Sequence, residues 1–137
     1  MKAKEIMSRP VQTCTPDAPL LGVAKLMSEH DCGSIPIVER NGVKHVIGMV
    51  TDRDIVTRAL AENTNPLELT AKDCMTLGVA TVFEDSDIED VCNIMEAIQV
   101  RRIPVIDADG DCVGIISQGD VAHYVRDHRI ANVVRQV

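Results

Sequence analysis

The fold is decided by residues 33–54, which read GSIPIVERNGVKHVIGMVTDRD. An apolar run around Ile-Pro leads to an Asn-Gly turn, and a second apolar run ends in a hydroxyl residue and an aspartate. Asn-Gly between two apolar runs is a strong short-range signal of a β-hairpin. Residues 101–120 have the same order and read RRIPVIDADGDCVGIISQGD. The sequence therefore predicts the same hairpin twice.

A repeat that spans most of the chain surrounds these two hairpins. A shift of 68 residues aligns similar residues before the turns: Ala3-Lys4 with Ala71-Lys72, Met7 with Met75, Val23 with Val91, Met27 with Met95, and Ile35-Pro36 with Ile103-Pro104. After the turns the shift becomes 66, and Gly48 meets Gly114, Thr51 meets Ser117 and Asp54 meets Asp120. Such self-similarity is typical of a fold built from repeated units.

Each copy predicts the order β-α-β-β-α. Apolar residues at i, i+3, i+4 and i+7 predict amphipathic helices from Leu20 and from Ile88. Pro19 suits the first turn of one helix, and Ser86-Asp-Ile-Glu89 has the pattern of a capping box for the other. The remaining elements are short first strands at 11–14 and 79–82, strands Ile35–Glu39 and Ile103–Asp107, partner strands that end at Val50 and Ile116, and final helices that start near Asp52 and Gln118.

A unit of about 60 residues is marginally stable by itself, so two copies are expected to pack together. We predict an α+β fold in which two β-α-β-β-α repeats pack through their sheets with pseudo-twofold symmetry around a cleft. The first repeat covers residues 1–60, a linker covers 61–70, and the second repeat with a C-terminal helix covers 71–137. In that last helix, Val125, Ile130, Val133 and Val134 would pack on a second chain.

Composition excludes several functional classes. The chain has 137 residues and a net charge of −7, which disfavours binding to nucleic acid or to an anionic membrane. With one Phe, one Tyr and no Trp, it lacks the aromatic platforms on which single-stranded nucleic acids stack. No secretion signal or membrane-spanning run is present, so a cytoplasmic location is expected.

The five cysteines predict no metal site, because they form no Cys-x-x-Cys pair and the histidines have no ligand spacing. Cys92 and Cys112 are interpreted as small buried hydrophobic residues. Cys14 and Cys32, in loop or strand-edge positions, leave open a redox-sensitive role.

The first candidate site motif is a hydroxyl residue three positions before an aspartate, at the strand-to-helix junction of each copy. Thr51 with Asp54, and Ser117 with Asp120, fit a helix capping box and need no ligand to explain them. The same atoms suit a nucleotide, because a helix start favours phosphate and a carboxylate accepts hydrogen bonds from ribose hydroxyls. Arg53 adds a cation in the first copy, where the second has Gly119.

The second candidate motif precedes the Ile-Pro strand. It is Gly33-Ser34-Ile35-Pro36 in the first copy and Arg101-Arg102-Ile103-Pro104 in the second. Proline lacks an N–H group, so we expect an unpaired strand edge there, with the backbone of Ile35 and Ile103 available to a flat heterocycle. Arg101 and Arg102 are either a solvated pair or a phosphate grip, for which the guanidinium fork is well suited.

The whole order resembles tandem CBS domains, the regulatory pair often called a Bateman module. The resemblance implies two stacked repeats that associate into a homodimer and bind AMP, ADP, ATP or S-adenosylmethionine as a regulatory ligand, with no required cofactor and no catalysis. Members of that family usually regulate an attached enzyme or transporter. Nothing is attached here, so we expect a stand-alone module that signals to a separate effector protein or through self-association. The ligand-binding residues that the resemblance implies are Thr15, Pro16, Ser34, Ile35, Pro36, Thr51, Arg53, Asp54, Thr81, Arg101, Arg102, Ile103, Pro104, Ser117 and Asp120.

The two copies differ at the positions that carry charge. Gln118-Gly119 replaces Asp52-Arg53, and Gly33-Ser34 replaces the paired arginines, so the two sites should differ in affinity. Two other functions stay open: a ligand-free dimeric scaffold in which the caps are only caps, and a small enzyme that uses Cys14 or Cys32 with His30.

Overall fold

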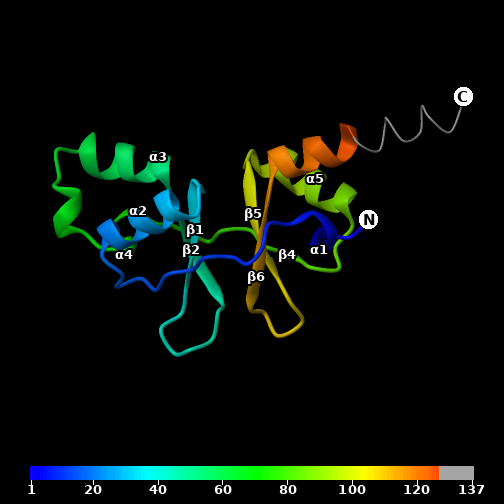
Figure 1. Ribbon diagram of the computed structural model, residues 1–137, viewed down its shortest axis with the longest axis horizontal. Helices are drawn as coiled ribbons and strands as arrows, with labels where there is room; N and C mark the ends of the chain where they lie inside the picture. Colours follow the sequence, from blue (N-terminus) through cyan, green and yellow to red (C-terminus); the bar gives the residue numbers. More distant parts are fainter. Residues whose placement is uncertain (127–137) are drawn as a thin grey trace, which may run out of the picture. The chain divides into compact units, whose positions relative to one another are not determined.

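The computed structural model describes residues 1–126 of the 137. Its contacts divide the chain into two compact units (Figure 1). The fold class is confirmed as α+β with two repeats, each built from a three-stranded sheet and helices. The first-repeat unit contains residues 11–80 and 109–112, and the second-repeat unit contains, among the described residues, 1–10, 81–108 and 113–126.

The first-repeat unit begins with helix α2 (Leu20–Glu29), whose start and apolar spacing match the prediction. Strands β1 (Ser34–Val38) and β2 (Val46–Thr51) pair antiparallel, and β3 (Thr76–Leu77) adds to the free side of β2. The remaining helical segments are α3 (Asp52–Ile55), the π-helical η1 (Val56–Leu60), the 3-10 helix η2 (Pro66–Glu68) and α4 (Ala71–Cys74). Its core contains Leu20, Val23, Ile35, Ile37 and Val50, all exposed by 1% or less.

The second-repeat unit has the matching plan. Its elements are α1 (Ala3–Ile6), β4 (Val82–Phe83), α5 (Ile88–Ile98), β5 (Arg102–Ile106) and β6 (Cys112–Ser117), and residues 118–126 are helical. The sheet order is β4-β5-β6, and β4 runs parallel to β5. The part of the predicted C-terminal helix beyond residue 126, with Ile130, Val133 and Val134, lies outside the described residues.

The compact units are divided differently from the sequence repeats. Residues 1–10 belong to the first repeat as predicted from the sequence but pack in the second-repeat unit, where α1 lies beside α5 (Figure 1). Ala3 is fully buried in that core, and Met7 lies next to it in the same cluster. Residues 71–80 pack in the first-repeat unit, where Ala71 and Cys74 are fully buried. Each repeat is therefore completed by a segment from outside its predicted range.

Gly48 and Gly114 lie three residues before the hydroxyl residue of each junction. Each makes room for the distant segment that completes its unit. A Cβ atom on Gly48 would lie 2.8 Å from the carbonyl oxygen of Thr76. A Cβ atom on Gly114 would overlap the sulfur of Met7 and lie 3.1 Å from the carbonyl oxygen of Ser8. Real Cβ atoms do not approach backbone oxygens as closely as the Gly48 case requires. Both glycines are thus needed for packing.

The two hairpin turns fit their predicted chemistry. Gly42 and Gly110 both have a φ of 86°, which favours glycine. The second turn also packs against the first hairpin: the Lys44 N–H donates to the Asp111 carboxylate at 3.0 Å, and the Cys112 N–H donates to the Lys44 carbonyl at 2.9 Å. These bonds explain why residues 109–112 belong to the first-repeat unit.

Three local predictions need correction. The first strands are shorter than expected, because the second copy has only β4 and the first has a single bridge from Cys14 to Ile37. The cap of α5 is Asp87 rather than Ser86. The Ser86 hydroxyl instead accepts from the Phe83 N–H, and the carbonyl of Met1 accepts from the first helical N–H, at Ile88. The backbone of Met1, which is distant in sequence, thus accepts a hydrogen bond at the start of α5.

Pro19 also lies just before its helix, at the cap position, rather than in the first turn.

None of the helices within residues 1–126 has the length and apolar character that crossing a bilayer requires.

Candidate functional site

The two strand-to-helix junctions have the same geometry in both copies. In the first, the Thr51 N–H donates to Oδ2 of Asp54 at 2.9 Å, and the Asp54 N–H donates to Oγ1 of Thr51 at 3.1 Å. In the second, the Ser117 N–H donates to Oδ2 of Asp120 at 2.9 Å, and the Asp120 N–H donates to Oγ of Ser117 at 3.0 Å. These are reciprocal capping boxes. They hold each hydroxyl and carboxylate side by side at a helix start.

A capping box by itself does not mark a ligand site. Thr70 and Asp73 form the same box at the start of α4, where the Thr70 N–H donates to Oδ2 of Asp73 at 2.8 Å. What distinguishes the two junctions is their repetition at matched places and the residues that surround them.

The second candidate motif lies directly beside the first in each copy. The Asp52 N–H donates to the Gly33 carbonyl at 3.0 Å, and the matching Gln118 N–H donates to the Arg101 carbonyl at 2.7 Å. In the first repeat, Ser34 is the direct cross-strand partner of Thr51. Two motifs that are separated by about 15 residues in sequence thus lie side by side in each unit.

The Ile-Pro strands are more fully covered than expected. The Pro36 carbonyl accepts from the Cys14 N–H at 3.2 Å, and the Val38 N–H donates to the Cys14 carbonyl at 2.8 Å. In the second copy, β5 is the central strand of its sheet. The prediction of an unpaired edge is therefore wrong at Pro36, whose carbonyl pairs with the first-strand segment. In the second copy, the first strand pairs with Val105 and Ile106.

The side chains of Ile35 and Ile103 are fully buried, as are those of Pro36 and Pro104. They support the site from within the core, so that only their backbone groups would be available to a ligand.

The candidate cations lie on different elements in the two copies. Arg53 is exposed in the first turn of α3. Arg101 is exposed just before β5, and Arg102, the first residue of β5, is half-buried. The first-repeat unit therefore has its cation on the helix, and the second has its cations on the strand.

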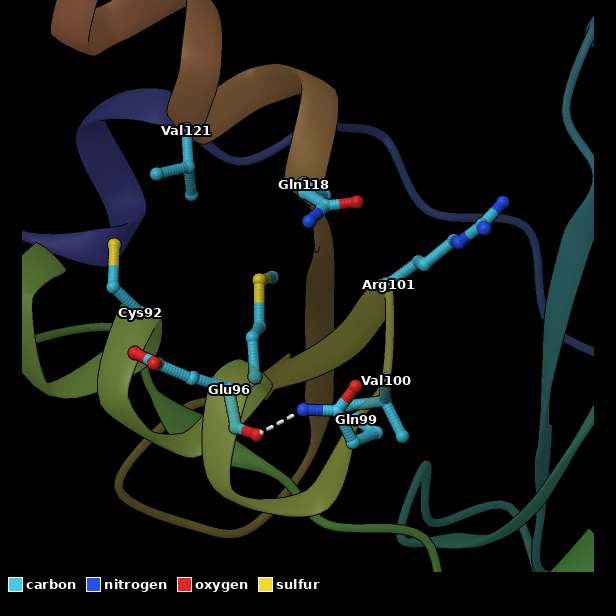
Figure 2. Close-up of a pocket in the computed structure, with 8 residues that line it drawn as sticks. Cys92, Glu96, Gln99, Val100, Arg101, Gln118 and Val121 are labelled. Carbon is cyan, nitrogen blue, oxygen red and sulfur yellow. Dashed lines mark hydrogen bonds between the residues drawn. The ribbon is translucent and has the colours of Figure 1, made fainter.

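A pocket of about 550 Å³ adjoins the second junction (Figure 2). Its lining comes from the end of α5, the turn after it and the start of the final helix: Cys92, Met95, Glu96, Gln99, Val100, Arg101, Gln118 and Val121. Gln99 has a positive φ of 56° and donates from its side chain to the Glu96 carbonyl at 2.8 Å. No local sequence pattern predicts this pocket, because its wall combines residues from 92–101 and 118–121 that the fold brings together.

The first-strand residues have less direct support. Thr15 follows the bridge at Cys14, and its carbonyl accepts from the Ala18 N–H at 3.1 Å. Pro16 is buried, and its carbonyl accepts from the Lys72 N–H at 3.0 Å. Thr81 is half-buried and comes directly before β4. Pro16 thus has a structural role in holding α4, whether or not a ligand lies nearby.

Three of the thiols have a raised pKa. Burial raises the pKa of the Cys14 thiol above its ordinary value, and burial is also the main cause of the raised pKa of Cys74 and Cys92. Cys112 is buried as predicted, but Cys92 is only half-buried and lines the pocket. Within residues 1–126, no three side chains of His, Cys, Asp or Glu form a group suited to a metal ion.

Comparison with known proteins identifies the family. The model of the CBS domain matches residues 3–61 and 71–127. The chain belongs to the CBS domain family. It is 35% identical over 135 residues to Hypoxic response protein 1 of Mycobacterium tuberculosis, a match that covers 98% of this chain and 92% of that relative. That relative is thus almost entirely made of the shared CBS pair.

Solved structures agree with this family. The crystal structure of Hypoxic response protein 1, described with two coordinated zinc ions, has a TM-score of 0.79 and covers 90% of this chain and 98% of that one. The CBS domain pair of protein MJ0100, in complex with 5-methylthioadenosine and S-adenosyl-L-methionine, has a TM-score of 0.82 at 27% identity, and the match covers 93% of this chain and 98% of that one.

Proposed function

We propose that this CBS pair is a stand-alone regulatory module that binds adenosine-containing ligands and signals to a separate effector protein. One observation carries the proposal. Both copies place a hydroxyl and a carboxylate together at a helix start, as a phosphate and a ribose would require, and a relative of the same family was solved with two adenosyl ligands.

In this proposal, Asp54 and Asp120 accept hydrogen bonds from ribose hydroxyls. One oxygen of each carboxylate, Oδ2, already accepts the N–H of the cap hydroxyl residue. Oδ1 is the atom that the cap leaves for a ligand. Thr51 and Ser117 would face the phosphate or the equivalent part of the ligand, with Arg53 in one site and Arg101 and Arg102 in the other.

We propose that the backbone groups of Ile35 and Ile103 contact the adenine base. The other residues proposed to line the ligand site are Thr15, Pro16, Ser34 and Thr81. The ligand class includes AMP, ADP, ATP and S-adenosylmethionine, as a regulatory ligand. We also propose that the chain acts as a homodimer and has no catalytic activity of its own.

Calorimetric titration of the purified protein with AMP, ATP and S-adenosylmethionine tests the proposal. Asp54→Asn and Asp120→Asn each keep an oxygen that can accept the cap N–H but remove the negative charge. Each should weaken binding at its own site by about tenfold or more, since hydrogen bonds to a charged partner contribute roughly 1.5–3 kcal/mol.

Asp73→Asn is the matched control, because it makes the same change in a capping box outside both junctions. It should leave the affinity unchanged. Absence of binding at millimolar concentration of every ligand, or normal binding by both junction variants, would overturn the proposal.

The second candidate function is a ligand-free dimeric scaffold. The capping boxes favour it, since they give every motif residue at the junctions a structural role. A thermal shift assay separates the two functions. A ligand at 100 times its Kd adds about 2.7 kcal/mol of stability, whereas the scaffold would unfold at the same temperature with and without nucleotide.

A further inference from the structure

Arg58 connects the first junction to a segment that is distant in sequence. It lies in η1, the π-helical segment that follows α3. Its Nη1 donates to the carbonyl oxygens of Cys74 at 3.1 Å and Met75 at 3.0 Å. Its Nε lies 3.8 Å from Oδ1 of Asp54. One guanidinium therefore faces both the candidate sugar-binding carboxylate and the end of α4.

The two oxygens of the Asp54 carboxylate have different neighbours. Oδ2 accepts the Thr51 N–H in the cap, whereas Oδ1 is the oxygen that faces Arg58. Only 15% of the Asp54 side chain is exposed. A ribose hydroxyl that donates to Oδ1 would compete with Arg58 for the space beside that oxygen.

The segment that Arg58 contacts leads directly into the sheet. Cys74 ends α4, and Met75 precedes β3, whose Thr76 and Leu77 pair with Met49 and Gly48 of β2. Met75 also packs next to Gly48, where a Cβ atom would lie 3.1 Å from its sulfur. Loss or weakening of the hydrogen bonds from Arg58 to the carbonyls of Cys74 and Met75 would therefore also affect the position of β3.

The matching positions of the second repeat hold different residues. Tyr124 stands where the repeat aligns Arg58, and residues 118–126 form a regular α-helix without a π-helical segment. Tyr124 and Ile6, the residue that aligns with Cys74, both pack against the apolar core of that unit. Short π-helical segments inside α-helices occur frequently at functional sites. The charge bridge and the π-helical turn are together features of the first repeat.

We propose that Arg58 is a positioning residue that couples the charge of Asp54 to the order of residues 74–77. Asp54 orients the guanidinium so that it holds both carbonyl groups, and a ligand that occupies Oδ1 changes that hold. The inference deepens the proposed function and its ligand step depends on it, but its first test needs no ligand.

The first test is hydrogen–deuterium exchange of the free protein, followed by mass spectrometry of peptides that cover residues 74–77. Arg58→Gln removes the charged donor, and Asp54→Asn removes the charge that orients it while it keeps a cap acceptor. Each should speed exchange of this segment by roughly threefold to tenfold, since the bonds are charge-assisted but partly exposed to water. The double variant should exchange no faster than Arg58→Gln alone.

Two variants control for charge and for the cap. Lys25→Gln removes an exposed cation of α2 in the same unit, and Asp120→Asn alters the matching cap in the other unit. Both should leave exchange of residues 74–77 unchanged. Equal exchange in wild type, Asp54→Asn and Arg58→Gln, or an additive double variant, would overturn the coupling.

The second test adds saturating AMP or S-adenosylmethionine. In the wild type, ligand should change exchange of residues 74–77 by at least about twofold, and in Arg58→Gln the ligand should bind without this change. A purely structural arginine would alter exchange equally with and without ligand. If the wild type binds neither compound, the proposed function fails while the ligand-free coupling stands. If it binds and Arg58→Gln shows the same ligand-induced change, the coupling fails and the proposed function stands.

Discussion

Replacing Gly48 with alanine tests how closely the segment after α4 approaches β2. The new Cβ atom would lie 2.8 Å from the Thr76 carbonyl oxygen and 3.1 Å from the Met75 sulfur. Ordinary van der Waals contact begins at 3.4 Å, so β2 and β3 must separate by about 0.6 Å. The atom in the way is backbone that pairs with β2, and it cannot rotate aside.

Overpacking of this kind typically costs about 1–3 kcal/mol, and we expect Gly48→Ala to lie at the upper end. Gly114→Ala should cost less, about 1–2 kcal/mol, because its closest neighbour is the flexible side chain of Met7. Gly22→Ala is the matched control. It lies in α2 with nothing within 4 Å of the new Cβ atom, and it should stabilise the protein by roughly 0.5–1 kcal/mol.

The assay is urea unfolding followed by far-UV circular dichroism, since the chain has no Trp and one Tyr. The expected order of midpoints, from lowest to highest, is Gly48→Ala, Gly114→Ala, wild type and Gly22→Ala. A Gly48→Ala midpoint equal to or above that of the wild type would refute the close approach of β3 to β2.

Three further predictions concern the caps, the N-terminal segment and the thiols. Thr51→Ala and Ser117→Ala each remove a side-chain cap, so each should lower the free energy of unfolding by about 1 kcal/mol in urea titrations; a change smaller than the error of the midpoint would contradict the capping geometry. The hydrogen bond from Lys2 lowers the pKa of Asp87 below its ordinary value of 3.8, so the stability that this pair contributes is present above that value and is lost as pH falls through the lowered pKa. In an NMR titration of the carboxyl carbon, Lys2→Ala should move the pKa of Asp87 back up, and an unchanged pKa would exclude the pair. Burial raises the pKa of the Cys14 thiol above 9.0, so iodoacetamide should modify it more slowly at neutral pH than it modifies a free thiol such as glutathione; equal rates would mean that this thiol is accessible.

Much of the local structure could be predicted from the sequence. The helices from Leu20 and Ile88 begin where their apolar spacing predicts, and the β1 and β5 strands differ from expectation by one residue at each end. The junctions at Thr51 and Ser117 form the predicted boxes. These features depend on residues within a few positions of one another, so short stretches of sequence contain the information.

The predictions that failed depend on segments distant in sequence. Ser86 does not cap α5, because the chain end at Met1 supplies an acceptor there. The strand edge at Pro36 is covered, because Cys14 pairs with it. A local pattern identifies a group that needs a partner but does not identify a competing partner from elsewhere in the chain.

The sequence by itself determined the repeat, the order of its elements and the hydroxyl–aspartate pairs, because these depend on periodicity, turn chemistry and capping over a few residues. Only the tertiary structure decided that residues 1–10 complete the second-repeat unit and residues 71–80 the first. It also decided that Gly48 makes room for backbone and that Arg58 reaches both Asp54 and the end of α4. These contacts join residues far apart in the chain, and their geometry is set by how whole elements pack.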